Sequence, residues 1–310
     1  MNLAELGYGA AFTLIPKLPR SVVWPLFAAA AAHGARRYRG GTGGKGTVRL
    51  ASNLRRVVGP AVSDAELADL VRRGLRSYAR YYLDALGLPG RSRAQHLAGF
   101  RLERGELLGQ HVADKVGAVI ALPHAGNWDA AGAWVAANGW PIVTVAERLK
   151  PESAYRRFLN FRRSLGMEIL PTTGGDRPAF DVLEERLRAG YVVPLLADRD
   201  LTARGVEVDF FGGRTRMPAG PALLALRTGA PLYVVSMWFD PDAAAGRLEG
   251  PIPLPGAGEG ALDVRVRLLT QRIADGLAEG IARNPQDWHM LQRLWIDTPA
   301  AADPAVVNPA

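Results

Sequence analysis

The feature that most constrains the fold is a set of short, continuously apolar runs that begin at about residue 115. The runs cover residues 116–122, 141–146, 191–197 and 231–239. A run that is apolar at every position, not at alternate ones, is typical of a strand buried on both faces. Helical patterns lie between the runs, over 129–138, 153–166, 177–189 and 219–228. Strands that alternate with helices predict an α/β fold with a largely parallel twisted sheet flanked by helices.

The residues before this alternating part have a different pattern and are expected to be mostly helical. Ser63 and Glu66 have the spacing of a capping box, which predicts the start of a long helix that runs to about Leu86. A further helix is expected over 271–283. We therefore expect one compact domain with three parts. They are a helical, membrane-associating N-terminal region (1–110), an α/β core (111–298) and a loose tail (299–310).

One N-terminal segment has the composition of a membrane-surface helix. Residues 21–33, SVVWPLFAAAAAH, are apolar, but a helix needs roughly 20 apolar residues to span a bilayer. Trp24 and Phe27 lie in this segment, and Arg20 and Arg36 flank it. Aromatic and basic residues together are typical of a helix that lies in the membrane interface. An ordinary helix packed on the rest of the protein is the alternative.

Charge and composition narrow the class of partner. The formal net charge is +8, which favours anionic partners such as lipid surfaces or phosphorylated small molecules. A GC-rich genome would also enrich arginine. No nucleic-acid-binding motif is present, so no nucleic-acid partner is expected. The chain has no cysteine, which excludes disulfides and a catalytic thiol, and the five histidines lack HExxH spacing, so no metal site is expected.

The residues that best predict chemistry follow the first apolar run. The segment LPHAGNWD places His124 directly after a predicted buried strand and Asp129 near the start of the next helix. Ligands of open α/β sheets bind at the carboxyl ends of strands. An aspartate at this spacing is expected to accept a hydrogen bond from one imidazole nitrogen and leave the other free to take a proton. The alternatives are a loop histidine and an aspartate that only caps the helix.

Several ordered segments extend this pattern into a family resemblance. PHAGNWDAAG, AERLKPESAYRRFLNFRRSLGMEIL, LLADRDLTARGVEVDFFGGRTRMPAGPALLALRTGAPL and NPQDWHMLQRLW cover roughly residues 115–295. Together they resemble the lipid A biosynthesis (lauroyl/myristoyl) acyltransferase family, which shares the HxxxxD motif. More closely, they resemble actinobacterial phosphatidylinositol mannoside acyltransferases.

The resemblance implies transfer of a fatty acyl group, with palmitoyl expected, from acyl-CoA to a mannose hydroxyl of a phosphatidylinositol mannoside. His124 is then the general base and Asp129 its orienting partner. Gly126 and neighbouring backbone N–H groups are candidate oxyanion donors. Acyl-CoA is a co-substrate, and no bound cofactor is expected. We expect a monomer that is peripheral to the cytoplasmic face of the plasma membrane, with an anionic lipid surface as partner.

Carboxylates at two further strand ends are candidate site residues. Asp198 and Asp200 follow the predicted strand over 191–197. Asp198 is expected to bind the acceptor sugar or to help hold His124, with a salt bridge to Arg199 as the alternative. Glu147 follows the strand over 141–146 and is expected to bind substrate, unless it only pairs with Arg148.

Arginines in and after these segments are candidate phosphate ligands, because a guanidinium binds phosphate in a bidentate manner. The candidates are Arg162, Arg199, Arg204, Arg214, Arg216 and Arg227. Arg162 is expected to reach the phosphates of CoA. Solvation of these side chains, or for Arg227 extension towards water from an apolar helix, is the alternative. His289 is expected to be structural.

Other functions remain open at the level of sequence. HxxxxD enzymes also act on lysophospholipids and other glycolipids, so the acceptor is not fixed by the motif. A thioesterase or esterase would use the same histidine to activate water. A non-enzymatic lipid-binding or nucleic-acid-binding protein would use only the positive charge.

Overall fold

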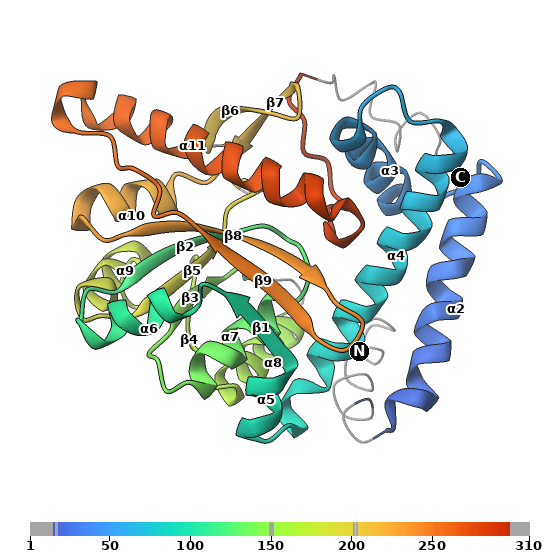
Figure 1. Cartoon of the computed structure of the whole chain (residues 1–310), viewed down its shortest axis with the longest axis horizontal. Helices are drawn as coiled ribbons and strands as arrows, with labels where there is room; N and C mark the ends of the chain where they lie inside the picture. Colours follow the sequence, from blue (N-terminus) through green and yellow to red (C-terminus); the bar gives the residue numbers. More distant parts are fainter. Residues whose placement is uncertain (1–14, 16–17, 149–151, 201, 203, 298–310) are drawn as a thin grey trace.

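The computed structural model describes residues 15, 18–148, 152–200, 202 and 204–297. The predicted tail 299–310 and most of the first residues of the N-terminal region lie outside these ranges. A five-stranded sheet forms the centre of the molecule, in the order β1-β9-β8-β2-β5 (Figure 1). The bounds are β1 (Phe100–Glu103), β2 (Ala118–Leu122), β5 (Val192–Leu196), β8 (Leu232–Phe239) and β9 (Ala244–Glu249). Neighbouring strands are parallel except for β8 and β9, which confirms the predicted largely parallel α/β sheet.

Two smaller strand pairs accompany this sheet. β3 (Val143–Ala146) and β4 (Glu168–Pro171) are parallel, and Ile142 joins them to β5 through a bridge to Val192. β6 (Val206–Phe210) and β7 (Gly213–Met217) form an antiparallel hairpin. The sequence predicted β3 and a strand that ends at Phe210, followed by a basic loop, but it missed β4, β9 and the second strand of this hairpin, β7, because each is short and only partly apolar.

Helices cover both faces and one side of the sheet (Figure 1). Their bounds are α2 (Arg20–Arg39), α3 (Lys45–Val58), α4 (Asp64–Leu86), α5 (Arg93–Gly99), α6 (Glu106–Ala113), α7 (Trp128–Ala137), α8 (Glu152–Ser164), α9 (Ala179–Arg188), α10 (Gly220–Thr228) and α11 (Leu262–Arg283). The capping box is present, because the Ser63 hydroxyl accepts from the backbone N–H of Glu66 and the Glu66 carboxylate accepts from that of Ser63. The predicted helix over 271–283 begins earlier, at Leu262.

The expected boundary at residue 110 does not separate helices from sheet. β1 lies before it and pairs in parallel with β9, through Phe100 and Ala244 among others. Phe100 is buried to 2% exposure. The helical part described by the structure therefore ends at Gly99, and the following strand belongs to the central sheet.

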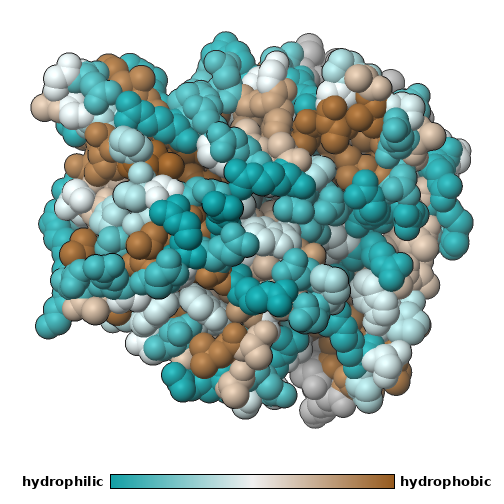
Figure 2. All heavy atoms as spheres, in the orientation of Figure 1, coloured by the Kyte–Doolittle hydropathy of each residue, from teal (hydrophilic) through white to brown (hydrophobic). Residues whose placement is uncertain are grey.

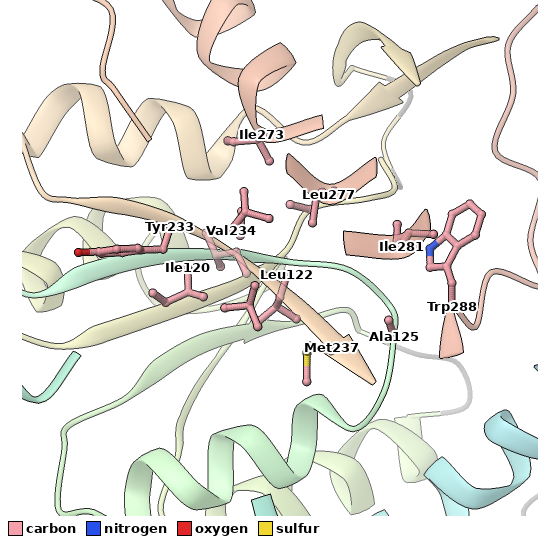
Figure 3. Close-up of a cluster of buried hydrophobic side chains, with 14 of the residues drawn as sticks. Ile120, Leu122, Ala125, Tyr233, Val234, Met237, Ile273, Leu277, Ile281 and Trp288 are labelled. Atoms are coloured by element: carbon pink, nitrogen blue, oxygen red, sulfur yellow. The ribbon is translucent and has the colours of Figure 1, made fainter. Parts of the chain in front are cut away.

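The two faces of the sheet have different neighbours. On β8, Val234 lies against Gly276 of α11, and Figure 3 shows Ile273 and Leu277 of α11 over that same face. Met237 points to the opposite face in that view, and it lines a cavity there. Because side chains alternate along a strand, one face is filled by α11 while the other is available to a ligand.

The surface seen in Figure 2 is mostly hydrophilic, with small separate groups of hydrophobic residues between the charged ones. On α2, however, Val22 is 55% and Leu26 is 70% exposed. Arg36, Arg37 and Arg39 follow in the last turn of the same helix. Among the described residues, no helix is both long enough and apolar enough to cross a membrane.

Candidate active site

The register of two neighbouring strands brings His124 and Asp198 together. β2 and β5 are parallel, and Leu122 at the end of β2 is paired with Leu196 at the end of β5. His124 is the second residue after Leu122, and Asp198 is the second after Leu196. The two side chains therefore leave the same edge of the sheet at the same level, which is the edge where open α/β sheets bind ligands.

The Asp198 carboxylate holds the His124 imidazole directly. Asp198 Oδ1 lies 2.6 Å from His124 Nδ1, and Asp198 Oδ2 accepts the backbone N–H of His124 at 2.9 Å. The indole N–H of Trp288 also donates to Oδ2, at 2.9 Å. Asp198 is completely buried, whereas the His124 side chain remains 22% exposed. One face of the dyad is thus fixed inside the protein and the other reaches solvent or substrate.

These contacts decide the charge of the carboxylate and the tautomer of the ring. Burial alone would raise the pKa of Asp198, but the His124 charge and the hydrogen bonds from His124 and Trp288 lower it below its ordinary value. An ionised carboxylate accepts hydrogen bonds only, so Nδ1 of His124 carries a proton. Nε2 is then left to act as a base, and the residues described by the structure make no hydrogen bond to it.

The predicted role of Asp129 as the orienting partner of His124 is wrong. Its carboxylate accepts from Arg162 Nε at 2.7 Å and from the Tyr81 hydroxyl at 2.9 Å, and Asp129 is only 2% exposed. Asp129 is the second residue of α7, whose N-cap is Asn127, and from this first turn its side chain points to Tyr81 of α4 and Arg162 of α8. The spacing of HxxxxD does not fix the direction of the Asp129 side chain. The same four intervening residues allow the carboxylate to point towards His124 or away from it.

Arg162 has a structural partner where a CoA phosphate was expected. Burial by itself would lower its pKa, but the charge of Asp129 and the hydrogen bond between them raise it. The pKa of Tyr81 is raised, mainly by burial and then by the negative charge of Asp129. Tyr81, Asp129 and Arg162 therefore form a buried polar cluster that joins α4, α7 and α8 beneath the active-site loop.

The segment 284–290 near the C-terminus holds the active-site loop from the other side. Gly126 donates its backbone N–H to the carbonyl of Asp287 at 2.9 Å, and His289 donates its backbone N–H to the carbonyl of His124 at 2.7 Å. Ala125 and Trp288 form an antiparallel bridge, and Figure 3 shows these two residues beside each other. The Gly126 N–H is therefore already bonded, so its predicted use as an oxyanion donor is wrong.

Gly126 has a steric role in the same loop. Its φ is +55°, and a Cβ there would lie 3.1 Å from both Met237 Cβ and Trp238 N. Left-handed backbone and close approach to β8 both favour glycine. The loop can thus cross the end of β8 and present His124.

His289 is structural, as expected. It is buried to 4% exposure, and its Nε2 lies 2.9 Å from the Ser77 hydroxyl. That hydroxyl is also 2.6 Å from Asp287 Oδ1. Burial, with a smaller contribution from His124, lowers the pKa of His289 to about 3. The ring is therefore neutral and buried, and the residue supports the loop through its backbone bond to His124.

A cavity of about 330 Å³ extends from His124 along the open face of the sheet. Its walls come mainly from five strands, β1, β2, β3, β5 and β8, and from α7 and α8. The strand residues are Phe100, Leu102, Ile120, Leu122, Thr144, Val145, Ala146, Val192, Pro194, Leu196, Val235 and Met237, and the helix residues include Gly132, Trp134, Val135, Tyr155 and Phe158. Apolar side chains form most of this lining, while His124, Asp129, Glu147, Arg162 and Arg199 supply its ionisable groups together with the tyrosines. The arrangement suits a ligand with a long apolar part and a reacting group at His124.

The other predicted carboxylates have different positions. Glu147 lines this cavity and is exposed, and it is not paired with Arg148, which bonds Glu152. Asp200 is not in the lining of the cavity at His124, and its carboxylate accepts from the backbone N–H groups of Thr202 and Gly205. Asp200 therefore shapes the loop after β5.

The remaining predicted arginines are not gathered at His124. Arg214 and Arg216 both pair with Glu207 on the β6–β7 hairpin. Arg227 pairs with Glu184 and lies over the Phe180 ring. Arg204 is exposed. Arg199 alone in this group lines the His124 cavity without a carboxylate partner among the residues that the structure describes.

Sequence reasoning missed Trp288, which bonds Asp198, Asp287, which holds the active-site loop at Gly126, and Tyr81, which bonds Asp129. The segment PQDWHM was part of the family resemblance, and it is separated from His124 by most of the core. Its place against the active-site loop is shown by tertiary contacts, namely the Ala125–Trp288 bridge and the backbone bonds to His124 and Gly126.

Comparison with known proteins identifies the family of the chain. Residues 5–297 match the family model described as bacterial lipid A biosynthesis acyltransferase. The chain is 45% identical to a protein of Mycolicibacterium smegmatis named phosphatidylinositol mannoside acyltransferase, over 95% of this chain and 92% of the relative. A protein of the same name from Mycobacterium tuberculosis is 44% identical, over 94% of this chain and 88% of the relative. The chain therefore belongs to the bacterial lipid A biosynthesis acyltransferase family.

Proposed function

We propose that this acyltransferase moves a fatty acyl group, palmitoyl in the first instance, from acyl-CoA to a mannose hydroxyl of a phosphatidylinositol mannoside. The acceptor follows from the names of the relatives, which share 44–45% identity over most of the chain. The observation that carries the chemistry is the His124 ring, held through Nδ1 by a buried carboxylate at the mouth of an apolar cavity.

The reaction needs one base and no enzyme nucleophile. His124 Nε2 removes the proton of the mannose hydroxyl, and the hydroxyl oxygen attacks the carbonyl carbon of the thioester. The tetrahedral intermediate collapses, the carbon–sulfur bond breaks, and the imidazolium returns its proton to the departing CoA thiolate. Asp198 stabilises the imidazolium between these two proton transfers. The catalytic pair proposed here is thus His124 with Asp198.

The cavity supports a fatty acyl donor. Leu122 and Leu196 lie next to the dyad, while Ile120 and Val192 lie earlier on the same strands. Four residues of strand span about 13 Å, so the apolar wall continues well beyond the reacting centre. Burying each methylene of a chain along such a wall contributes about 0.8 kcal/mol, which favours long-chain thioesters over short ones.

A membrane surface supplies the acceptor in this proposal. α2 exposes Val22 and Leu26, and its last turn carries Arg36, Arg37 and Arg39. Apolar side chains that enter the interface and basic ones that meet anionic headgroups are the two contributions to peripheral binding. The protein is then peripheral to the cytoplasmic face of the plasma membrane.

The test is acyl transfer by purified protein, read by mass spectrometry. Palmitoyl-CoA is offered with phosphatidylinositol mannosides, lysophospholipids and other glycolipids as separate acceptors. We expect acylated mannoside with the wild type. His124→Ala should lower the rate about 100- to 10,000-fold while circular dichroism shows that the variant is still folded, and His33→Ala, which alters an exposed histidine, should keep full activity.

Two results would contradict the assignment. Acylation of a lysophospholipid but not of the mannoside would show that the acceptor is a lysophospholipid. Release of free palmitate without acylated product, at a rate that depends on His124, would identify a thioesterase.

A further inference from the structure

A second cavity opens beside the His124 site. It has a volume of about 380 Å³ and is lined by Arg199, Asp200, Arg216, Arg293, Leu294, Trp295 and Ile296; we call it the basic pocket. Arg199 lines both the basic pocket and the cavity at His124. A ligand can therefore occupy the basic pocket while another part of the same ligand, or of its reaction partner, lies at His124.

Arg199 is the residue that points to a ligand. It directly follows Asp198 and is half-buried, and its Nε is buried without a hydrogen-bond partner in the described part of the chain. Arg162 and Arg216, by contrast, have carboxylate partners at 2.7 and 2.8 Å. A buried donor of a charged group that lacks an acceptor is costly. An anionic ligand that accepts from Arg199 would remove this cost.

The rest of the basic pocket is positively charged as well. Arg216 shares Glu207 with Arg214 and keeps 37% of its side chain exposed. Arg293 adds a third guanidinium to the lining. The one carboxylate in the lining, Asp200, is bonded to Thr202 and Gly205. Burial by itself would raise the pKa of Asp200, but these hydrogen bonds lower it below the ordinary value. Arg199, whose Nε lacks a partner in the described part of the chain, therefore lies in a pocket whose other guanidinium groups add positive potential, and this favours an anion.

We propose that the basic pocket binds a phosphate group of a substrate, with Arg199 as the ligand nearest the catalytic dyad. This proposal rests on the proposed function, in which both substrates carry phosphate: acyl-CoA in its nucleotide part and the mannoside in its phosphodiester. Arginine forks bind phosphate oxygens in a bidentate manner. The phosphate is held at Arg199 while the thioester carbonyl or the sugar hydroxyl lies at His124. Asp198 connects the two positions, because it precedes Arg199 in the chain and bonds the His124 ring.

Direct binding tests the pocket without acyl transfer. Isothermal titration calorimetry with coenzyme A and, separately, with glycerophosphoinositol measures affinity for the two phosphate-bearing groups. Arg199→Gln keeps the length and polarity of the side chain but removes its charge. It should weaken one of these two ligands about tenfold to a hundredfold. Arg199→Lys should recover part of the loss, and Arg177→Gln, a matched change at an exposed ion pair with Glu185, should change neither affinity.

Steady-state kinetics distinguish the two sources of phosphate. If the pocket takes CoA, Arg199→Gln raises KM for palmitoyl-CoA but not for palmitoyl-pantetheine, which lacks the nucleotide. If it takes the acceptor headgroup, the variant raises KM for the phosphatidylinositol mannoside but not for methyl mannoside. Arg216→Gln should raise the same KM by a smaller factor, because Glu207 already shares its charge.

The proposal is overturned if Arg199→Gln leaves both affinities and both KM values unchanged, or if it lowers only kcat. The second result would mean that Arg199 positions Asp198 and holds no phosphate. These outcomes differ from failure of the proposed function, in which the wild type itself would show no acyl transfer to the mannoside while the calorimetry still reports on the pocket.

Discussion

Trp288 donates its indole N–H to the buried carboxylate of Asp198, from a segment that lies 90 residues further along the chain. The same carboxylate oxygen accepts the backbone N–H of His124, and the other oxygen bonds the His124 ring. A completely buried carboxylate is stable only when its oxygens are bonded. Trp288 therefore fixes the orientation of Asp198, and through it the orientation of the proposed base.

Trp288→Phe removes the N–H and keeps most of the ring. We expect kcat to fall about 10- to 100-fold, because a hydrogen bond to a charged group is worth roughly 1.5–3 kcal/mol, while KM for both substrates stays unchanged. The measurement is steady-state acyl transfer with palmitoyl-CoA. A change confined to KM would show that Trp288 acts on substrate binding and not on Asp198.

Asp198→Asn tests the dyad itself. An amide in place of the carboxylate no longer fixes the tautomer or stabilises the imidazolium, so kcat should fall about 100- to 10,000-fold. The double variant with His124→Ala should be no slower than His124→Ala alone, because the two groups act as a unit. Losses that multiply in the double variant would contradict a shared role.

Asp129 and Arg162 should act on stability. Removing either partner leaves the other charge buried, which costs about 3–5 kcal/mol in the free energy of unfolding. Urea denaturation should show this loss in the free energy of unfolding for Asp129→Asn and for Arg162→Met as single variants. The double variant Asp129→Leu/Arg162→Met, which removes both charges, should recover much of the loss. If Asp129→Asn abolished catalysis at unchanged stability, the carboxylate would instead belong to the catalytic machinery.

His289 predicts a pH dependence of stability. Its pKa is 6.5 in an ordinary setting and about 3 in the folded protein, so below pH 6.5 the unfolded chain binds a proton that the folded chain does not. As the pH falls from roughly 6 to 3, this residue should therefore lower the free energy of unfolding by about 1.4 kcal/mol for each pH unit. Urea denaturation at pH 6.5, 5.5 and 4.5 should show a shallower slope for His289→Gln than for the wild type. Equal slopes would mean that the ring is already solvated in the folded state.

Val192 should help to set the preferred acyl-chain length. It lines the cavity at the start of β5, whereas Leu196 lies at the end next to Asp198. Val192→Phe fills space about 13 Å from the reacting end and should lower kcat/KM for palmitoyl-CoA much more than for decanoyl-CoA. The added volume also costs about 1–3 kcal/mol of stability. An equal loss for both thioesters would indicate general damage to the core and not a shortened cavity.

The sequence by itself determined the class of fold and the position of His124. Continuous apolar runs such as 116–122 predict buried parallel strands without knowledge of their neighbours, and a histidine directly after such a strand lies at the edge where ligands bind. These are local properties of the chain. The short strand β1 was missed because its four residues alternate in burial and its partner is β9, far away in sequence.

Only the tertiary structure decided which carboxylate meets the imidazole. Asp129 is close to His124 in sequence, but the first turn of α7 directs it to Tyr81 and Arg162. Asp198 is 74 residues away, and the parallel register of β2 and β5 places it against the ring. Spacing along a chain restricts the reach of a side chain but not its direction, whereas strand pairing fixes both. The pairing of β2 with β5 therefore determines that His124 meets Asp198.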